Sequence, residues 1–190
     1  MKEKIGRFPT TGRIGRIVKI LDRAAGRAAV KKVMKGVDEF IVLSRPEDKA
    51  DWMRRMIGRM ERTIGTRKTA HVMQACGRMC CGVTSRKRAA AVRKQSPALN
   101  DIISELNRIR LGGGRLKIID EHTIKGGYDR CYCGLVSKTR NKFPSLNYCT
   151  CSTGWYQQLF ETALGRPVKV EITRSIIAGA KTCEFVIRIQ

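Results

Sequence analysis

Apolar residues recur at three- and four-residue spacing through much of the first 111 positions, as they do in amphipathic helices. The clearest stretch follows Ser44, where Pro46 and Glu47 fit a capping box and a first helical turn. Gly65 and Gly82 stand where helices would end. The spacing predicts helices over residues 17–35, 46–64, 66–81, 85–94 and 97–109.

The period changes after Gly112-Gly113-Gly114, where alternating apolar and polar residues replace the helical spacing. Gly126-Gly127 fits the turn of a first hairpin, and Gly179 marks the turn of a second. Residues 152–164, between the two hairpins, return to the helical spacing. The alternation predicts strands over residues 115–120, 128–136, 168–173 and 185–189. The fold class predicted is α+β: N-terminal helices followed by two antiparallel hairpins with an intervening helix.

The same pattern divides the chain into segments. Residues 1–16 are basic and Gly-rich and predict a flexible arm, and residues 17–111 form the helical part. Residues 112–114 are a glycine joint, and residues 115–190 form a β-rich part that would bind a ligand or a metal. A length of 190 residues suits one compact domain that includes both parts.

A formal net charge of +23, concentrated in residues 1–95, adds a candidate class of partner. Such a surface attracts nucleic acid or an acidic protein partner, although a solvated basic surface explains the charge equally well. No zinc-finger spacing or aromatic RNA-recognition motif accompanies it. No apolar run has the length of a membrane span or a signal peptide, which predicts a cytoplasmic protein.

Eight cysteines add candidate chemistry, because thiols in the cytoplasm stay reduced and available for metals. Cys131-Tyr-Cys133 and Cys149-Thr-Cys151 resemble paired metal knuckles, which could supply four ligands to zinc or, as the alternative, hold an iron–sulfur cluster. Cys76 and Cys80 lie four residues apart on a predicted helix, so they share a face. They would either join the site or serve as small core residues.

The tail also resembles a known family. Tyr148-Cys149-Thr-Cys151-Ser-Thr-Gly154-Trp155, Leu164-Gly165-Arg-Pro167-Val168 and Cys183-Glu184-Phe185 resemble the 4-vinyl reductase (hydrocarbon-binding) domain, which is related to the Bet-three fold. The resemblance covers residues 115–190 and implies a protein that is often dimeric and encloses a small apolar ligand.

The resemblance also implies site residues. Trp155, Leu159 and Phe160 would line the pocket or its underlying core. Zinc would be held by Cys149 or Cys151, by Glu171 and by Cys183, whereas Arg174 occupies the position of the remaining ligand. The candidate metal ligands are therefore Cys76, Cys80, Cys131, Cys133, Cys149, Cys151 and Cys183.

These observations favour a small-molecule-binding, sensor-type protein with a Cys-rich metal site. A fainter similarity to aminothiazoline carboxylate hydrolases implies an alternative, a Cys-dependent hydrolase. A cysteine nucleophile needs a nearby base, and His71 and His122 are the two histidines of the chain. The third alternative is a basic nucleic-acid-binding protein. Whether the protein is an enzyme stays open at this point.

Overall fold

The computed structural model describes residues 8–95 and 98–190 and has an α+β architecture. Its helices are α1 (Gly12–Val33), α2 (Val37–Val42), α3 (Pro46–Ile64), α4 (Thr66–Cys80), α5 (Val83–Gln95), α6 (Leu99–Arg108) and α7 (Thr150–Leu164), with short 3-10 turns η1 (Asn147–Cys149) and η2 (Ile176–Ala178). Its strands are β1 (Lys117–Asp120), β2 (Thr123–Tyr128), β3 (Val168–Arg174) and β4 (Cys183–Ile189). The predicted fold class is confirmed.

The helical half follows the apolar spacing closely. Helices α3 and α4 meet at Gly65, whose φ of 81° few other residues adopt. The predicted capping box of Ser44 and Glu47 is wrong: Arg45 is the N-cap of α3, and no side chain caps that helix end. Helix α1 begins at Gly12, earlier than the predicted start at residue 17. Residues 1–7 of the predicted arm lie outside the described residues, as do Ser96 and Pro97, at the expected N-cap and first position of the predicted helix over residues 97–109.

The four strands form one antiparallel sheet in the order β1-β2-β4-β3, so the two predicted hairpins join through β2 and β4. One face of the sheet carries apolar residues such as Phe185 and Ile187, which pack in a core with α7. The other face carries polar side chains, among them Lys169, Glu171 and Arg188. This alternation is the one expected for a sheet with one buried face.

The predicted position of the second strand is wrong. Gly126-Gly127 is not a turn: both residues lie inside β2 and pair with Phe185 and Glu184. A Cβ atom on Gly127 would overlap the carbonyl oxygen of Cys183, so Gly127 permits close approach of two strands, and one on Gly126 would meet the side chains of Leu116 and Tyr156. The hairpin turns instead at His122, whose N–H donates to Asp120. The segment 129–146 is therefore irregular, and it carries Cys131 and Cys133.

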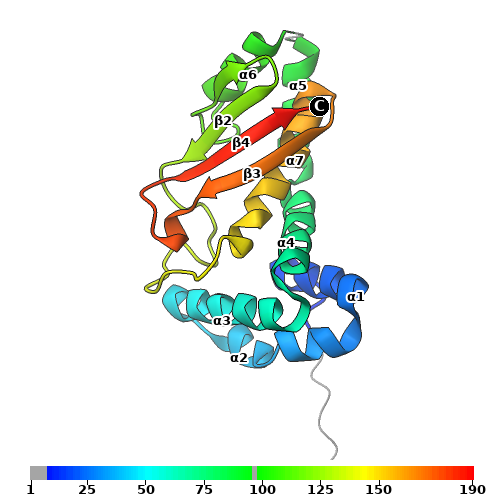
Figure 1. Cartoon of the computed structure of the whole chain (residues 1–190), viewed down its shortest axis with the longest axis vertical. Helices are drawn as coiled ribbons and strands as arrows, with labels where there is room; N and C mark the ends of the chain where they lie inside the picture. The colour runs from blue at the N-terminus through cyan, green and yellow to red at the C-terminus, as the bar shows by residue number, and fades with distance from the viewer. Residues whose placement is uncertain (1–7, 96–97) are drawn as a thin grey trace, which may run out of the picture.

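Two apolar cores flank α7. One core gathers α1, α2, α3 and α4 together with Tyr148, and the other gathers α5, α6, α7 and the sheet. Figure 1 shows α7 running between the sheet and the green helices α4 and α5, with α1, α2 and α3 grouped at the opposite end of the molecule from α6. The irregular segment 129–146 connects the sheet to this helical end. Within the described ranges, no helix is both long and apolar enough to cross a membrane.

Candidate metal and ligand site

Helices α4 and α7 touch backbone to backbone because each carries a glycine at the crossing. A Cβ atom on Gly77 would overlap the carbonyl of Cys151, and one on Gly154 would overlap the carbonyl of Gln74. Arg78 of α4 also joins the two helices, because its guanidinium donates to both carboxylate oxygens of Glu161 of α7, at 3.1 and 2.6 Å. The first turn of α7 is therefore held directly against α4.

This crossing brings three thiols together. Cys76 and Cys80 project from the same face of α4, and Cys151 reaches them from α7. Their sulfur atoms all lie within 4.8 Å of one another. Cys76 is fully buried, whereas Cys80 and Cys151 are half-buried. In the part of the chain that the structure describes, this is the one group of three or more potential metal ligands.

The three thiols share protons unequally. Hydrogen bonds from Cys151 and Cys76 lower the pKa of Cys80, with further help from the charges of Arg13 and Arg16. Hydrogen bonding to the other two sulfurs, together with burial, raises the pKa of Cys151. For Cys76 the hydrogen bond with Cys151 lowers the pKa, but Cys80 and burial outweigh it and raise the pKa to about 11. The cluster thus favours one thiolate, at Cys80, with two thiol donors.

The cluster forms part of the wall of a cavity of about 810 Å³. Six of the eight cysteines line this cavity: Cys80, Cys131, Cys133, Cys149, Cys151 and Cys183. Aromatic rings of Tyr128, Tyr148 and Trp155 complete much of its wall. A cavity of this size suits a small organic molecule.

The remaining cysteines of the cavity have separate partners. Arg13 donates to the sulfur of Cys133 at 2.5 Å, and the hydroxyl of Tyr148 lies 3.2 Å from the same atom. The sulfur of Cys149 lies 3.0 Å from the hydroxyl of Ser175, and burial raises the pKa of Cys149 to about 12. The two predicted Cys-x-Cys knuckles therefore share the cavity without coming together as a compact ligand set in the described residues.

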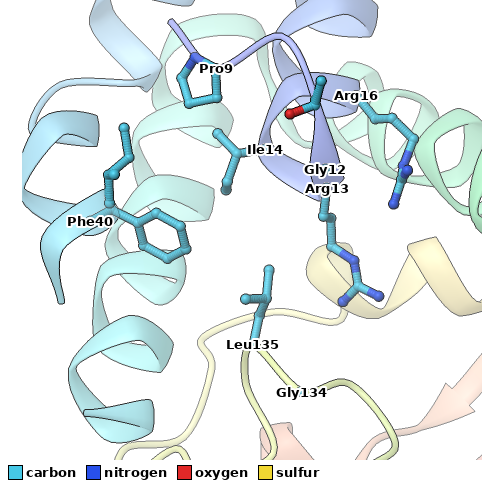
Figure 2. Close-up of a pocket in the computed structure, with 10 residues that line it drawn as sticks. Pro9, Gly12, Arg13, Ile14, Arg16, Phe40, Gly134 and Leu135 are labelled. Atoms are coloured by element: carbon cyan, nitrogen blue, oxygen red, sulfur yellow. The ribbon is translucent and has the colours of Figure 1, made fainter. Parts of the chain in front are cut away.

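A second cavity, of about 460 Å³, lies beside the first, between the start of α1, helix α2 and the segment 129–146. Ile14, Phe40 and Leu135 give it an apolar lining. Figure 2 shows Arg13 extending from α1 toward the loop of Gly134 and Leu135. Because Arg13 lines both cavities, its side chain forms part of the wall between them.

The other predicted site residues lie in varied places. Trp155 lines the larger cavity, whereas Leu159 and Phe160 are fully buried in the core against the sheet. Glu171 lies on the polar face of the sheet, where it pairs with Lys169 and Arg188. It is not near the thiol cluster, and Arg174 pairs with Glu184.

Neither histidine lies at the cavity. His71 and His122 are both exposed, and His122 pairs with Glu121 beside the first hairpin turn. The base that the predicted Cys-dependent hydrolase would need is therefore not provided by a histidine in the described structure.

Sequence reasoning missed Arg13, Arg110 and Tyr148 as cavity residues. It also passed over the glycines that bring α4 and α7 together. Gly77 and Gly154 stand inside helices, where glycine costs about 1 kcal/mol relative to alanine, so their presence was a usable signal of close packing.

Comparison with known proteins gives a family but no function. The model of a family of unknown function (DUF6144) matches residues 14–190. No curated protein matches the chain.

Solved structures of H-NOX proteins cover most of the chain at low similarity. The structure titled "Probing the function of heme distortion in the H-NOX family" is 16% identical, covers 94% of this chain and 92% of its own, and has a TM-score of 0.45. "Structural insights into the molecular mechanism of H-NOX activation" is 15% identical over 93% of both chains, with a TM-score of 0.43. "Modulating Heme Redox Potential Through Protein-Induced Porphyrin Distortion" is 15% identical, covers 93% and 97%, and has a TM-score of 0.42. Likenesses this weak carry no argument about what this chain binds.

Two expectations from the sequence are corrected here. The resemblance to the 4-vinyl reductase domain and the Bet-three fold is wrong, because the family whose model matches residues 14–190 is a different one. The predicted zinc and iron–sulfur cofactors are wrong as well, because the two Cys-x-Cys pairs do not come together as a four-ligand set in the described residues. A physical reason agrees: structural zinc takes four ligands in a tetrahedron, and the cluster offers three. The match over residues 14–190 shows that the chain belongs to the family of unknown function DUF6144.

Proposed function

We propose that the protein binds a small molecule in its thiol-lined cavity and holds a soft monovalent metal ion, Cu(I), in the wall of that cavity. The ion would be bound by Cys76, Cys80 and Cys151. The observation that carries the proposal is that these three sulfur atoms lie within 4.8 Å of one another and that two of them line the cavity.

The ligand set favours Cu(I) for reasons of chemistry. Thiolate sulfur is a soft ligand and selects soft ions such as Cu(I). Three sulfurs leave a tetrahedral ion one ligand short, whereas Cu(I) is satisfied by three. The lowered pKa of Cys80 supplies one thiolate at neutral pH, and the ion would displace the protons of Cys76 and Cys151. Arg13 and Arg16 offset the resulting negative charge.

The position of the cluster connects the ion to the cavity. Cys76 is fully buried behind the ion, and Cys80 and Cys151 border the cavity. A bound ion would therefore face the cavity on one side, where a soft donor atom of a small molecule could contact it. This arrangement suits a sensor, because ligand and metal would occupy adjoining sites.

Anaerobic titration with Cu(I) against a competing chelator tests the proposal. We expect one tightly held ion per chain, and we expect Cys80→Ser and Cys151→Ser to weaken binding at least about a hundredfold, since each removes one of three thiolate ligands. Cys131→Ser is the matched control, because Cys131 lines the same cavity outside the cluster.

Circular dichroism of each variant separates loss of the site from loss of the fold. Equal affinity of Cys80→Ser and Cys131→Ser for Cu(I) in folded protein would refute the site. A Soret band after addition of hemin, together with absence of Cu(I) binding, would replace the copper proposal with a heme one.

A further inference from the structure

Helix α6 ends in a backbone motif that normally requires glycine. The N–H of Leu111 donates to the carbonyl of Leu106 at 2.9 Å, and the N–H of Arg110 donates to that of Asn107 at 3.0 Å. These two bonds form a Schellman motif, in which the residue at the position of Arg110 adopts the left-handed conformation. Arg110 does so, with φ of 53°. Among the residues that the structure describes, it is the one non-glycine residue with positive φ.

This conformation costs stability that a glycine would not lose. Leu106 and Leu111, the apolar partners of the motif, are buried as the motif requires, so the helix end itself is well formed. Backbone strain of this kind is concentrated at functional sites. Arg110 is one of the residues that line the 810 Å³ cavity.

Two further arginines line the same cavity from other parts of the chain. Arg13 comes from α1 and donates to Cys133, and Arg130 lies over the ring of Tyr132 at 4.9 Å from its centre. In residues 8–95 and 98–190, none of the three arginines forms an ion pair with a carboxylate. Asp129 is the one acidic residue in the lining, so three guanidinium groups outnumber it.

Aromatic side chains make up another part of the wall. Trp155 and Tyr128 present rings to the cavity, and Tyr132 stands more than half exposed beside Arg130. Guanidinium groups bind carboxylates through paired N–H donors, and aromatic rings stack on planar groups.

We infer that the cavity takes a small organic carboxylate with a planar apolar body. Its carboxylate pairs with Arg110 and Arg130, and its body lies against Trp155 and Tyr128. The inference rests on the small-molecule half of the proposed function and not on the copper site.

Phenylacetate and its neutral counterpart phenylacetamide are the probes. The chain has two tryptophans, so two indole N–H signals report binding by NMR. Trp155 lines the cavity, whereas Trp52 is buried in the other core and donates to Gly36 at 2.8 Å, which makes it an internal control. We expect phenylacetate to shift the Trp155 signal alone, with phenylacetamide binding at least about fivefold more weakly. Equal binding of the two probes would overturn the inference.

Arg110→Gly separates function from folding. It removes the guanidinium and relieves the left-handed strain, so we expect the Tm to rise by about 2–4 °C while phenylacetate binding weakens about threefold to fivefold. Arg115→Gly removes the same charge from an exposed residue that does not line the cavity, and it should leave binding unchanged. If both variants weakened phenylacetate binding equally, the overall charge of +23 would explain the binding, and the inference would be overturned.

Cys76→Ser keeps the two proposals apart, because Cys76 belongs to the thiol cluster but does not line the cavity. If it abolishes Cu(I) binding and leaves phenylacetate binding intact, both stand. If Cu(I) never binds but the Trp155 shift depends on Arg110, the copper site fails and the anion site survives.

Discussion

Proton sharing among Cys76, Cys80 and Cys151 governs how these residues can act. The two thiols with raised pKa values donate toward the sulfur of Cys80, whose own pKa is lowered. Only one negative charge therefore faces an incoming ion at neutral pH. Two protons must leave before three thiolates can bind the same ion, and that requirement has a measurable consequence.

Cu(I) affinity should depend steeply on pH. Because the ion displaces two protons, the apparent affinity is expected to rise about a hundredfold per pH unit between about pH 6 and pH 8, well below the pKa of about 11 at Cys76. Competition titrations across this range, corrected for protonation of the chelator, measure the slope. A flat profile would mean that the thiols of Cys76 and Cys151 do not bind the ion.

Helices and strands with a strong apolar period were predictable at the element scale. Helices α3 and α7 and strand β3 lie where the spacing predicted them, because burial of one face follows directly from that spacing. The sequence misplaces β2 because Gly127 allows close approach of β4 and Gly126 leaves room for the side chains of Leu116 and Tyr156, and in a sequence these two glycines look the same as a turn. The pairing of Cys76 with Cys80 was predictable from one helix. The position of Cys151 beside these two residues depends on how α4 and α7 cross, and no local sequence pattern specifies that crossing.

The glycine crossing of α4 and α7 makes a prediction at this scale. Gly154→Ala places a methyl group against the carbonyl of Gln74, which is backbone and cannot move aside. We expect a loss of about 3 kcal/mol in the free energy of unfolding and a weaker copper site, since overpacking forces the helices apart. Chemical denaturation measures the first effect and metal titration the second.

Gly58→Ala is the matched control for that change. Gly58 also lies inside a helix, α3, but its added methyl group would meet only the end of the Arg62 side chain, at 3.4 Å. Alanine there should stabilise the protein by about 0.5–1 kcal/mol through helix propensity. If Gly154→Ala lowered the free energy of unfolding no more than Gly58→Ala does, the backbone contact between α4 and α7 would be refuted.

At the scale of the whole molecule, the cavity lies where the two apolar cores meet. Cys80 and Tyr148 belong to the core of α1, α2, α3 and α4, whereas Trp155 and Cys183 belong to the core of the sheet. Any ligand that fills the cavity therefore contacts both halves of the protein. Binding should stabilise the molecule as a unit and not one half alone.

Thermal unfolding checks this whole-molecule consequence. An ion whose free concentration is a hundred times its Kd adds about 2.7 kcal/mol to the free energy of unfolding. We expect Cu(I) to raise the Tm of the protein by about 5–10 °C in a single transition, and to leave the Tm of Cys80→Ser unchanged. Two transitions, only one of them shifted by Cu(I), would show that the halves unfold independently.

The arginines of the cavity wall also bear on how an ion would reach the thiols. A free cation approaching past Arg110 and Arg130 meets a repulsive field, whereas an anion is drawn in. Cys76 is fully buried, whereas Cys80 and Cys151 line the cavity, so an ion in the cavity meets these two sulfurs first. Copper would therefore arrive as a negatively charged thiolate complex that hands its ion to Cys80 and departs. The cavity would in that way admit copper as a negatively charged complex and repel copper as a free cation.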